Sequence, residues 1–343
     1  MTEQRTEFTP DSAGAYFQEQ GVIPADATPR TRSLGGGVSN HVIEIRWGDN
    51  CLVAKQPLPN LAVEDDWPAD VGRVHNEASA ARAYADIIDA ADLVARTPAV
   101  RYENETDHVI GLDCAPADAL MWKRELLDGI VDTHVARTLG RLLGTVHARA
   151  AGDDRLRQQF EHDRPFDQLR IDPYHRTTAE RHPDVADAIR AEIDRVTDVH
   201  RTLVHGDYSP KNVLLERNGG PVPWILDFEV AHWGDPAFDT AFMLNHLCIK
   251  SVFNHERNAA YLGAAEAFWT AYDTCVDWDI EADTVRELGV LMLARVDGKS
   301  PVEYVEEGPI ADALRSVAKG ALRQDLRTLE RFRERIRTEV ARL

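Results

Sequence analysis

The chain has 343 residues, of which 43% are hydrophobic and 28% are charged. This composition is typical of a soluble globular protein with enough material for one large domain or two packed ones. The formal net charge of −19 argues against nucleic acid or an anionic membrane as a partner, because both would be repelled. No apolar run reaches the roughly 18 residues of a membrane span. Residues 1–14 lack the apolar stretch of a signal peptide, so we expect a cytoplasmic protein.

The basic residues are almost all arginine: of 39 Lys and Arg, six are lysine. Abundant Asp and Glu with scarce Lys favours a surface adapted to a salt-rich cytoplasm, as in halophilic proteins, where screening tolerates heavy like charge. An ordinary acidic protein from a GC-rich genome is the alternative. The cysteines have no close partner in the sequence, so we expect buried free thiols and, for any metal, magnesium bound by oxygen ligands. They are Cys51, Cys114, Cys248 and Cys275.

Strand and turn signals dominate the first part of the chain. Residues 1–30 contain three prolines and form an expected lead-in, with one short helix around 15–20. The glycine-rich segment 33–40 predicts a turn. Alternating apolar positions at 41–47 and a short apolar run at 51–55 then predict two strands.

Helical periodicity takes over after these strands. Apolar residues recur on one helical face over 71–88, and 109–112 is a short predicted strand. Later helices are predicted over 131–150, over 183–199, and from 236 to the C-terminus, the last of them over 311–343.

The simplest division is a small antiparallel-sheet lobe at 31–115 and a larger helical lobe at 116–343. Such an arrangement is an α+β fold.

The most informative segment runs from His205 to Asn212, between short strands predicted at 202–204 and 213–215. Its glycine and proline favour a tight loop. Asp207 and Asn212 suit a carboxylate that accepts a hydroxyl proton and an amide that holds magnesium against a nucleotide triphosphate. A surface turn with an Asx cap is the alternative for each residue alone.

A second acidic group follows three apolar residues in Trp-Ile-Leu-Asp-Phe-Glu. A carboxylate at the end of a buried strand is unfavourable unless a cation accompanies it. Magnesium would supply that cation, so we expect Asp227 to be a metal ligand together with Asn212. In the following Gly-Asp-Pro-Ala-Phe-Asp segment, we expect Asp235 and Asp239 to fix the loop and cap a helix.

These motifs resemble those of the aminoglycoside phosphotransferase and choline kinase family, small-molecule relatives of the protein kinases. The resemblance rests on His205-Gly-Asp with Asn212, on Leu226-Asp-Phe, and on the segment 234–239, and it extends from about residue 34 to 241. It implies a protein-kinase-like fold of two lobes, with ATP between them and magnesium at the active site.

The resemblance also implies an ATP site. Lys55, after an apolar strand, would pair with nucleotide phosphates, and Glu77 on the next helix would be its partner. The glycines at 35–37 would let the backbone close over the phosphates, and the segment 113–115 would form the hinge that meets adenine. The ATP-binding residues so implied are Lys55, Glu77, Gly36, Gly37, Ser39, Asn40, Asp113 and Ala115.

Within the family, the first lobe resembles that of the methylthioribose kinases in three places: 55–59, 66–68, and Arg73 before Glu77. The catalytic loop departs from that pattern, because those enzymes lack the Ser-Pro-Lys-Asn found here at 209–212. The likeness indicates a pentose-type acceptor and leaves methylthioribose itself open.

Substrate recognition is expected in the helical lobe. The segment 291–301 ends an apolar helix with two cations, a carboxylate and a serine around a glycine. These cations could hold a substrate phosphate or cap the helix C-terminus, and both remain open. Tryptophans 67, 122 and 233 could line a pocket or pack in the core, and His147 is expected in the core. The candidate substrate residues are Arg295, Lys299, Asp297, Lys211 and Trp233.

Three functions follow. The first is an ATP- and magnesium-dependent kinase, with Asp207 as base, that acts on a pentose or phosphopentose such as ribose 1-phosphate. The second keeps the reaction but uses an aminoglycoside antibiotic, a polycation that Arg295 and Lys299 would oppose. The third is a non-catalytic nucleotide-binding homologue, whose usual signature is the loss of Lys55, Asp207 or Asp227. We expect a small-molecule partner, and a monomer or homodimer.

Overall fold

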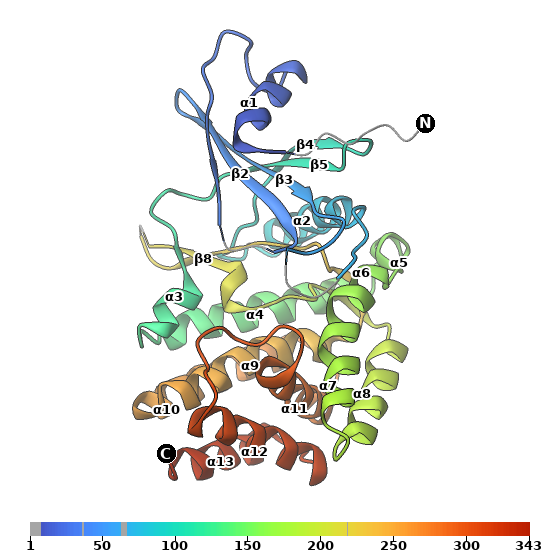
Figure 1. Ribbon diagram of the computed structural model, residues 1–343, viewed down its shortest axis with the longest axis vertical. Helices are drawn as coiled ribbons and strands as arrows, with labels where there is room; N and C mark the ends of the chain where they lie inside the picture. The colour runs from blue at the N-terminus through green and yellow to red at the C-terminus, as the bar shows by residue number, and fades with distance from the viewer. Residues whose placement is uncertain (1–7, 36–37, 63–66, 218) are drawn as a thin grey trace.

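Two lobes of unlike construction make up the protein (Figure 1). The computed structural model describes residues 8–35, 38–62, 67–217 and 219–343. A small antiparallel sheet with two helices forms one lobe, and a larger set of helices forms the other. The α+β class expected from the sequence is confirmed.

The small lobe is built on an antiparallel sheet whose strand order, among the described residues, is β1-β2-β3-β5-β4. The predicted strands at 41–47, 51–55 and 109–112 are confirmed. Sequence patterns do not identify β4, because its residues are mostly polar and none is fully buried. The strands are β1 (Arg30–Ser33), β2 (Asn40–Trp47), β3 (Asn50–Pro57), β4 (Val100–Asn104) and β5 (Val109–Asp113).

Helix α1 (Pro10–Glu19) is longer than the short helix expected around 15–20. It begins at a Thr9 cap, whose hydroxyl accepts the Ser12 amide hydrogen at 3.3 Å. It contacts β1 and β2, and Phe17 shares an apolar cluster with Ile45. The N-terminal segment therefore packs onto the sheet.

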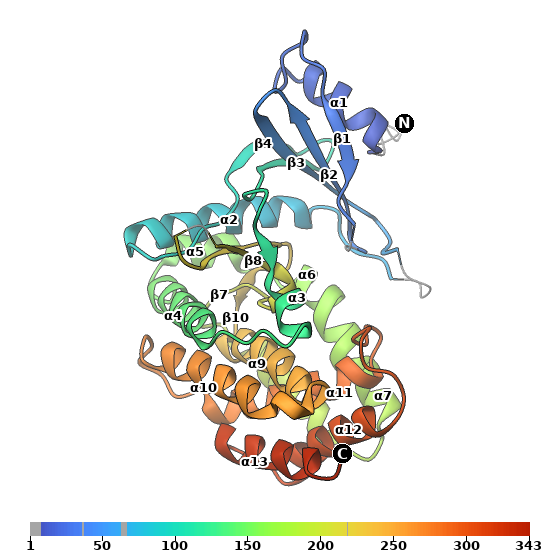
Figure 2. The same cartoon turned by 90° about the vertical axis from the view of Figure 1, so that its left-hand side faces the viewer.

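Helix α2 (Arg73–Ala90) confirms the helix predicted at 71–88. Val74 and Ala78 are fully buried on the face that packs against β5. Figure 2 shows α2 lying between the sheet and the large lobe. This position lets α2 present side chains to both lobes.

The expectation of four free thiols is wrong, because Cys51 and Cys114 form a disulfide. Antiparallel pairing of β3 with β5 sets Leu52 opposite Asp113, so the two flanking cysteines lie side by side with a Cα–Cα distance of 5.7 Å. Their separation of 63 residues hides this proximity in the sequence. The free cysteines are Cys248, which is buried, and Cys275, which is partly buried.

The long helices of the large lobe pack around α9, which contacts α10, α11, α12 and α13. The helices predicted at 131–150 and 183–199 are confirmed as α4 and α8. None of the helices in the described ranges is long and apolar enough to cross a membrane. The main helices are α3 (Trp122–Leu127), α4 (Thr133–Ala150), α5 (Asp154–Phe160), α6 (Arg164–Phe166), a π-helix (Asp167–Arg176), α7 (Thr177–Arg181), α8 (Ala186–Asp198), α9 (Pro236–Phe253), α10 (Asn258–Asp273) and α11 (Glu281–Asp297).

Two glycines let α4 and α10 approach closely. A Cβ atom added at Gly140 would lie 2.1 Å from the Phe268 carbonyl oxygen, and one at Gly144 would lie 2.7 Å from that of Tyr272. Both distances are shorter than a van der Waals contact, so only glycine fits at these positions.

The single charged helix predicted over 311–343 is wrong. The chain forms α12 (Pro309–Arg323) and α13 (Leu329–Val340), with a break at which Asp325 has a left-handed φ of +46°. A continuous helix would leave the apolar face of its second half in solvent. Folding back buries that face in the main core. Its buried residues are Leu329, Phe332 and Ile336.

Short strands carry the loop predicted to be catalytic. Strands β7 (Thr202–Val204) and β8 (Val213–Glu216) confirm the two strands expected around it. They do not pair with each other. β7 pairs with β10 (His232–Gly234), and β8 lies between β6 (Leu120–Met121) and β9 (Val222–Ile225). The loop therefore crosses from one small sheet to another.

Candidate active site

A buried carboxylate holds the backbone of the loop between β7 and β8. Asp239, in the first turn of α9, accepts the amide hydrogens of His205 at 2.7 Å and Gly206 at 2.9 Å. Its Oδ2 also lies 3.3 Å from Nε2 of the buried His147. Burial raises the pKa of Asp239, but the hydrogen bond from His147 and the other contacts lower it below its ordinary value. The predicted loop-fixing role of Asp239 is confirmed, as is the capping of α9 by Asp235.

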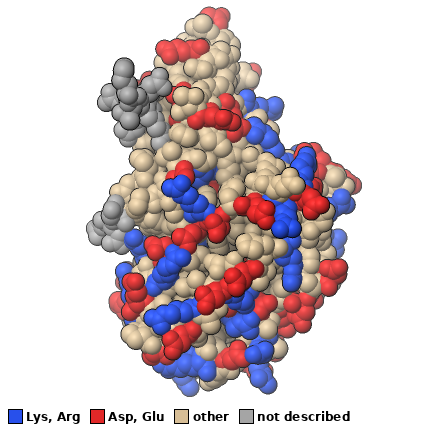
Figure 3. Space-filling model, turned by 90° about the vertical axis from the view of Figure 1, so that its right-hand side faces the viewer, with Lys and Arg blue, Asp and Glu red and all other residues tan. Residues whose placement is uncertain are grey.

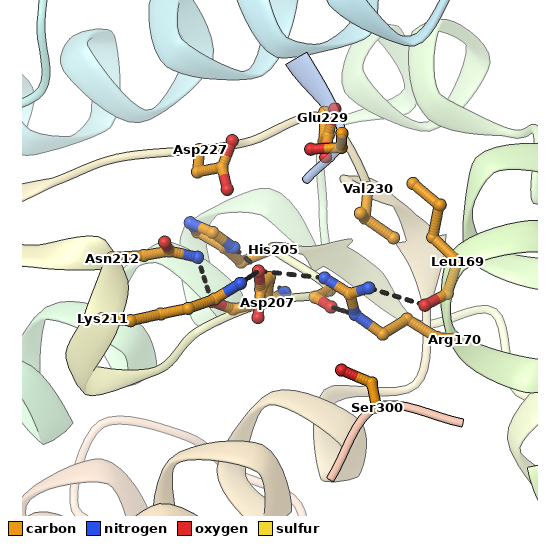
Figure 4. A network of polar contacts seen from close by, with 12 residues as sticks. Leu169, Arg170, His205, Asp207, Lys211, Asn212, Asp227, Glu229, Val230 and Ser300 are labelled. Carbon is orange, nitrogen blue, oxygen red and sulfur yellow. Dashed lines mark hydrogen bonds and ion pairs between the residues drawn. The ribbon is translucent and has the colours of Figure 1, made fainter. Parts of the chain in front are cut away.

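Asp207 lies at the centre of this loop and is almost fully buried, at 3% exposure. The preceding Gly206 has a φ of +75°, and a Cβ there would lie 2.7 Å from the Val230 carbonyl oxygen. Asp207 Oδ2 is 2.9 Å from both Arg170 Nη2 and Lys211 Nζ (Figure 4). Two cations therefore share one oxygen and hold the carboxylate in a single orientation.

Arg170 is a member of this site that no sequence pattern identifies. Its Nε donates to the Gly206 carbonyl at 2.7 Å and its Nη1 to the Leu169 carbonyl at 2.6 Å. Its guanidinium also lies 5.6 Å from the ring centroids of Tyr174 and Phe242. It comes from the π-helix, a rare conformation that is frequent at functional sites.

Asn212 and Asp227 offer the oxygen donors that magnesium prefers. Asn212 donates its side-chain amide to the Asp207 carbonyl at 3.0 Å, which leaves its Oδ1 for a cation, and Figure 4 shows this oxygen on the side of Asp227. The Leu226 amide donates to the Asn212 carbonyl at 2.9 Å and brings the two segments together. Asp227 has a φ of +68°, a backbone conformation that clusters at functional sites. The donor set therefore fits a hard divalent cation.

Lys55 of β3 joins the two lobes. Its Nζ lies 2.5 Å from Glu77 Oε1 on α2 and 3.0 Å from Asp227 Oδ1 in the large lobe. Burial raises the pKa of Glu77 to about 7, against the opposing charge of Lys55. Burial also raises the pKa of Asp227, but Lys55 and then Lys211 outweigh it and lower that pKa below its ordinary range. The predicted partners Lys55 and Glu77 are thus brought together with the predicted metal ligand.

A second contact between the lobes lies beside this one. Arg73 Nε of α2 is 2.9 Å from Glu229 Oε2, and both side chains are almost fully buried. The same oxygen accepts a hydrogen bond from Asn40 Nδ2 at 2.9 Å, and Arg73 Nη2 donates to the Ser39 carbonyl at 2.5 Å. The segment that begins β2 is therefore fastened to the loop that carries the predicted metal ligand Asp227.

The remaining predicted nucleotide-binding residues belong to the glycine-rich segment and to the segment at the end of β5. Gly36 and Gly37 lie outside the described residues. Asp113 ends β5, where both of its carboxylate oxygens lie 2.7 Å from the Arg101 guanidinium on the neighbouring strand. Ala115 follows in the segment that leads to α3. The hinge role of 113–115 stays a prediction.

The candidate substrate residues divide into two groups. Arg295 Nη1 lies 3.1 Å from the Tyr174 hydroxyl, whose ring contacts Arg170, so Arg295 belongs to the surroundings of the catalytic loop. Lys299 Nζ lies 5.3 Å from the centroid of the Trp67 ring. Asp297 instead forms an ion pair with Arg315 and lies 3.0 Å from His182 Nε2, and Trp233 is a buried residue of β10. The structure brings Arg295 and Lys211 near Asp207 and directs Asp297 elsewhere.

Comparisons with known proteins agree with this architecture. The sequence model of the APH family, described as the phosphotransferase enzyme family, matches residues 30–275. No curated protein sequence shows a significant match.

Solved structures of similar fold cover most of the chain. The macrolide 2′-phosphotransferase MphH from Brachybacterium faecium is 17% identical, covers 96% of this chain and 98% of its own, and has a TM-score of 0.50. A spectinomycin phosphotransferase, APH(9)-Ia, in complex with ADP and spectinomycin is 12% identical, with coverages of 98% and 100% and a TM-score of 0.52. An aminoglycoside 3′-phosphotransferase of type VIII is 18% identical, with coverages of 83% and 98% and a TM-score of 0.52. At these identities they show the fold alone, and they confirm the protein-kinase-like two-lobed fold. The family's sequence model matches well over half of the length of this chain. The chain therefore belongs to the APH phosphotransferase family, whose members transfer phosphoryl groups to hydroxyls.

Proposed function

We propose that the protein is an ATP- and magnesium-dependent kinase for a small sugar-type alcohol. The acceptor that we favour is a pentose or phosphopentose such as ribose 1-phosphate. The observation that carries the proposal is Lys55, whose Nζ reaches Glu77 at 2.5 Å and Asp227 at 3.0 Å while Asp207 lies on the adjoining loop. This arrangement supports a complete phosphoryl-transfer site, because it joins a phosphate-binding cation, a metal-binding carboxylate and a base.

In this function Asp207 accepts the proton of the acceptor hydroxyl, and its orientation is set by Arg170 and Lys211. Lys55 binds the nucleotide phosphates. Asn212 and Asp227 would hold magnesium, which when bound neutralises charge on the phosphates. Because catalysis of phosphoryl transfer is mostly positioning and charge stabilisation, these six side chains would supply what the reaction requires.

The basic residues near Asp207 support an uncharged or anionic acceptor over a polycationic one. Arg170 and Lys211 pair with Asp207, and Arg295 is linked to Arg170 through Tyr174. An aminoglycoside would place several ammonium groups beside these cations, which is unfavourable. The likeness of the small lobe to that of methylthioribose kinases supports a pentose ring.

The test is a panel of acceptors assayed for ATP consumption with magnesium. It contains pentoses, pentose phosphates, methylthioribose, nucleosides and aminoglycosides. We expect turnover of a pentose or its phosphate, and none in the Asp207→Asn variant. If only an aminoglycoside is turned over, the acceptor is an antibiotic and not a sugar. If no acceptor is turned over, a non-catalytic role is favoured.

We also propose that the surface is adapted to a salt-rich cytoplasm. The net charge of −19 supports this, as do the interspersed acidic and basic side chains on one face of the large lobe (Figure 3). Exposed ion pairs also occur elsewhere in the described residues, for example between Arg176 and Asp167. Urea unfolding in low and in molar KCl tests the proposal, which predicts a higher midpoint at high salt. An unchanged midpoint contradicts it.

A further inference from the structure

Lys250 is a buried cation without a carboxylate. It lies on α9 with no exposed surface, and its Nζ is 3.2 Å from the Tyr304 hydroxyl and 3.4 Å from the His246 carbonyl. Among the described residues, no carboxylate comes within 4.0 Å of this nitrogen. Lys55 and Arg73, which are comparably buried, each pair with a carboxylate. Lys250 differs from these two buried cations even though the chain contains 58 Asp and Glu residues.

Further positive charge gathers around Lys250. Burial lowers its pKa to about 7, and the charges of Lys123 and Arg295 contribute to the fall. Arg295, at the last turn of α11, bonds to the Tyr174 hydroxyl and to Ser300, and its buried Nε has no hydrogen-bond partner within the ranges that the structure describes. Lys123 is paired with Glu303, so one carboxylate faces several cations. The cluster formed by Lys123, Lys250 and Arg295, here called the basic cluster, is therefore short of negative charge.

Such a cluster is costly without an external anion. A buried ammonium loses its hydration, and neighbouring cations repel it. The contacts to the Tyr304 hydroxyl and the His246 carbonyl are neutral and only partly replace a counter-ion. A phosphate monoester would supply the missing charge and several acceptor oxygens.

The basic cluster is connected to the catalytic loop. Arg295 and Arg170 each lie 5.6 Å from the centroid of the Tyr174 ring, and Arg170 contacts Asp207. Phe242, which contacts Arg170, lies two turns before Lys250 on the same face of α9. Figure 4 shows Ser300 directed toward the contacts of Arg170 with Asp207. The basic cluster is thus connected to Asp207 through Arg295, Tyr174 and Arg170.

We propose that Lys250 and Arg295, with the hydroxyls of Ser300 and Tyr304, bind a phosphate monoester group carried by the acceptor. This inference rests on the proposed kinase function and specifies its acceptor as a sugar phosphate. The loop between α11 and α12 supplies Ser300 and Tyr304, so it would close over the phosphate. Lys319, which lies outside both this region and the proposed ATP site, pairs with Asp184 and serves as a control.

Binding of inorganic phosphate tests the subsite without any turnover. With the nucleotide site filled by ADP and magnesium, we expect millimolar phosphate to raise the melting temperature of the wild type and of Lys319→Met. The rise should be lost in Lys250→Met and kept in Lys250→Arg. Without phosphate, Lys250→Met should melt no lower than the wild type, since it removes an uncompensated cation. An equal rise in Lys250→Met would overturn the proposal.

Kinetics then separate this inference from the proposed function. For ribose 1-phosphate, we expect Lys250→Met to lower kcat/KM about tenfold to hundredfold, the worth of a charge-assisted contact, with KM for ATP unchanged. For ribose the same variant should change little. If ribose is the better acceptor and Lys250→Met does not distinguish the two sugars, the kinase function stands and the subsite is wrong. If phosphate binding needs Lys250 but no acceptor turns over, the subsite stands and the kinase function is wrong.

Discussion

Arg73 of α2 and Glu229 of the large lobe form an ion pair between the lobes, with Nε and Oε2 2.9 Å apart and side-chain exposures of 0% and 6%. Arg73 also donates to the carbonyls of Ser39 and Leu58, so a single side chain binds three separate segments. Removing one partner leaves a buried charge uncompensated.

We therefore predict that Arg73→Met lowers the free energy of unfolding by about 3 to 5 kcal/mol, the usual cost of breaking a buried pair. Urea denaturation measures this change. The control is Arg82→Met, since Arg82 is half exposed and its bond to Glu103 should contribute less than about 1 kcal/mol. Equal losses in the two variants would show that the buried pair has no special role.

The two cations on Asp207 should differ in what they do. Arg170 is buried and anchored to two backbone carbonyls, whereas the Lys211 side chain is 45% exposed and its one described ion pair is with Asp207. We therefore expect Lys211 to turn toward an incoming phosphoryl group and Arg170 to hold the loop.

We predict that Lys211→Met keeps the wild-type melting temperature and lowers kcat about hundredfold, as for the loss of one charge-stabilising donor. Arg170→Met should lower both kcat and the melting temperature. Differential scanning calorimetry and steady-state kinetics distinguish the two. A Lys211→Met enzyme with normal kcat would exclude a role in transfer, and Lys211→Arg should retain part of the rate.

Lys250 should make stability depend on pH. Burial lowers its pKa from 10.5 to about 7, so between these values the unfolded chain binds a proton that the folded protein does not. Stability then rises with pH across this window, and below pH 7 the cost of the buried charge is fully present. The charged or titratable groups around Lys250 are Lys123, Arg295, Glu303, His246 and Tyr304.

The measurement is the difference in unfolding free energy between the wild type and Lys250→Met at several pH values. The contributions of titratable groups present in both proteins cancel in this difference. We predict that the wild type gains relative to the variant from pH 7 toward pH 10, by no more than roughly 5 kcal/mol. A difference that is independent of pH would contradict a lowered pKa.

The disulfide between Cys51 and Cys114 should stabilise the small lobe. It closes a loop across a sequence separation of 63 residues, for which chain entropy gives about 4 kcal/mol. We predict that dithiothreitol lowers the urea midpoint of the wild type. The double variant Cys51→Ser, Cys114→Ser should already have that lower midpoint and should not respond to reduction. A wild type insensitive to the reductant would show that the bond contributes little.

Much of the architecture follows from local patterns. Helices α2, α4 and α8 are predicted from helical patterns, β2 from alternating apolar positions and β3 from a short apolar run. Prediction fails where residues are partly buried or where the chain must turn back, as at β4 and between α12 and α13. At those places the decisive quantity is burial against distant elements, which local periodicity does not contain.

The sequence by itself determined the reaction. Spacing within one loop predicts roles for Asp207 and Asn212, a second motif predicts Asp227 as a metal ligand, and the family resemblance adds Lys55, because phosphoryl transfer needs a base, a metal site and a phosphate-binding cation. Only the tertiary structure revealed that Arg170 pairs with Asp207, that Glu229 pairs with Arg73 and that Cys114 bonds to Cys51. It also revealed that Lys250 meets a hydroxyl and a carbonyl but, within the described part of the chain, no carboxylate. Whether a buried charge is paired depends on residues brought together from far apart, so it is decided by packing alone.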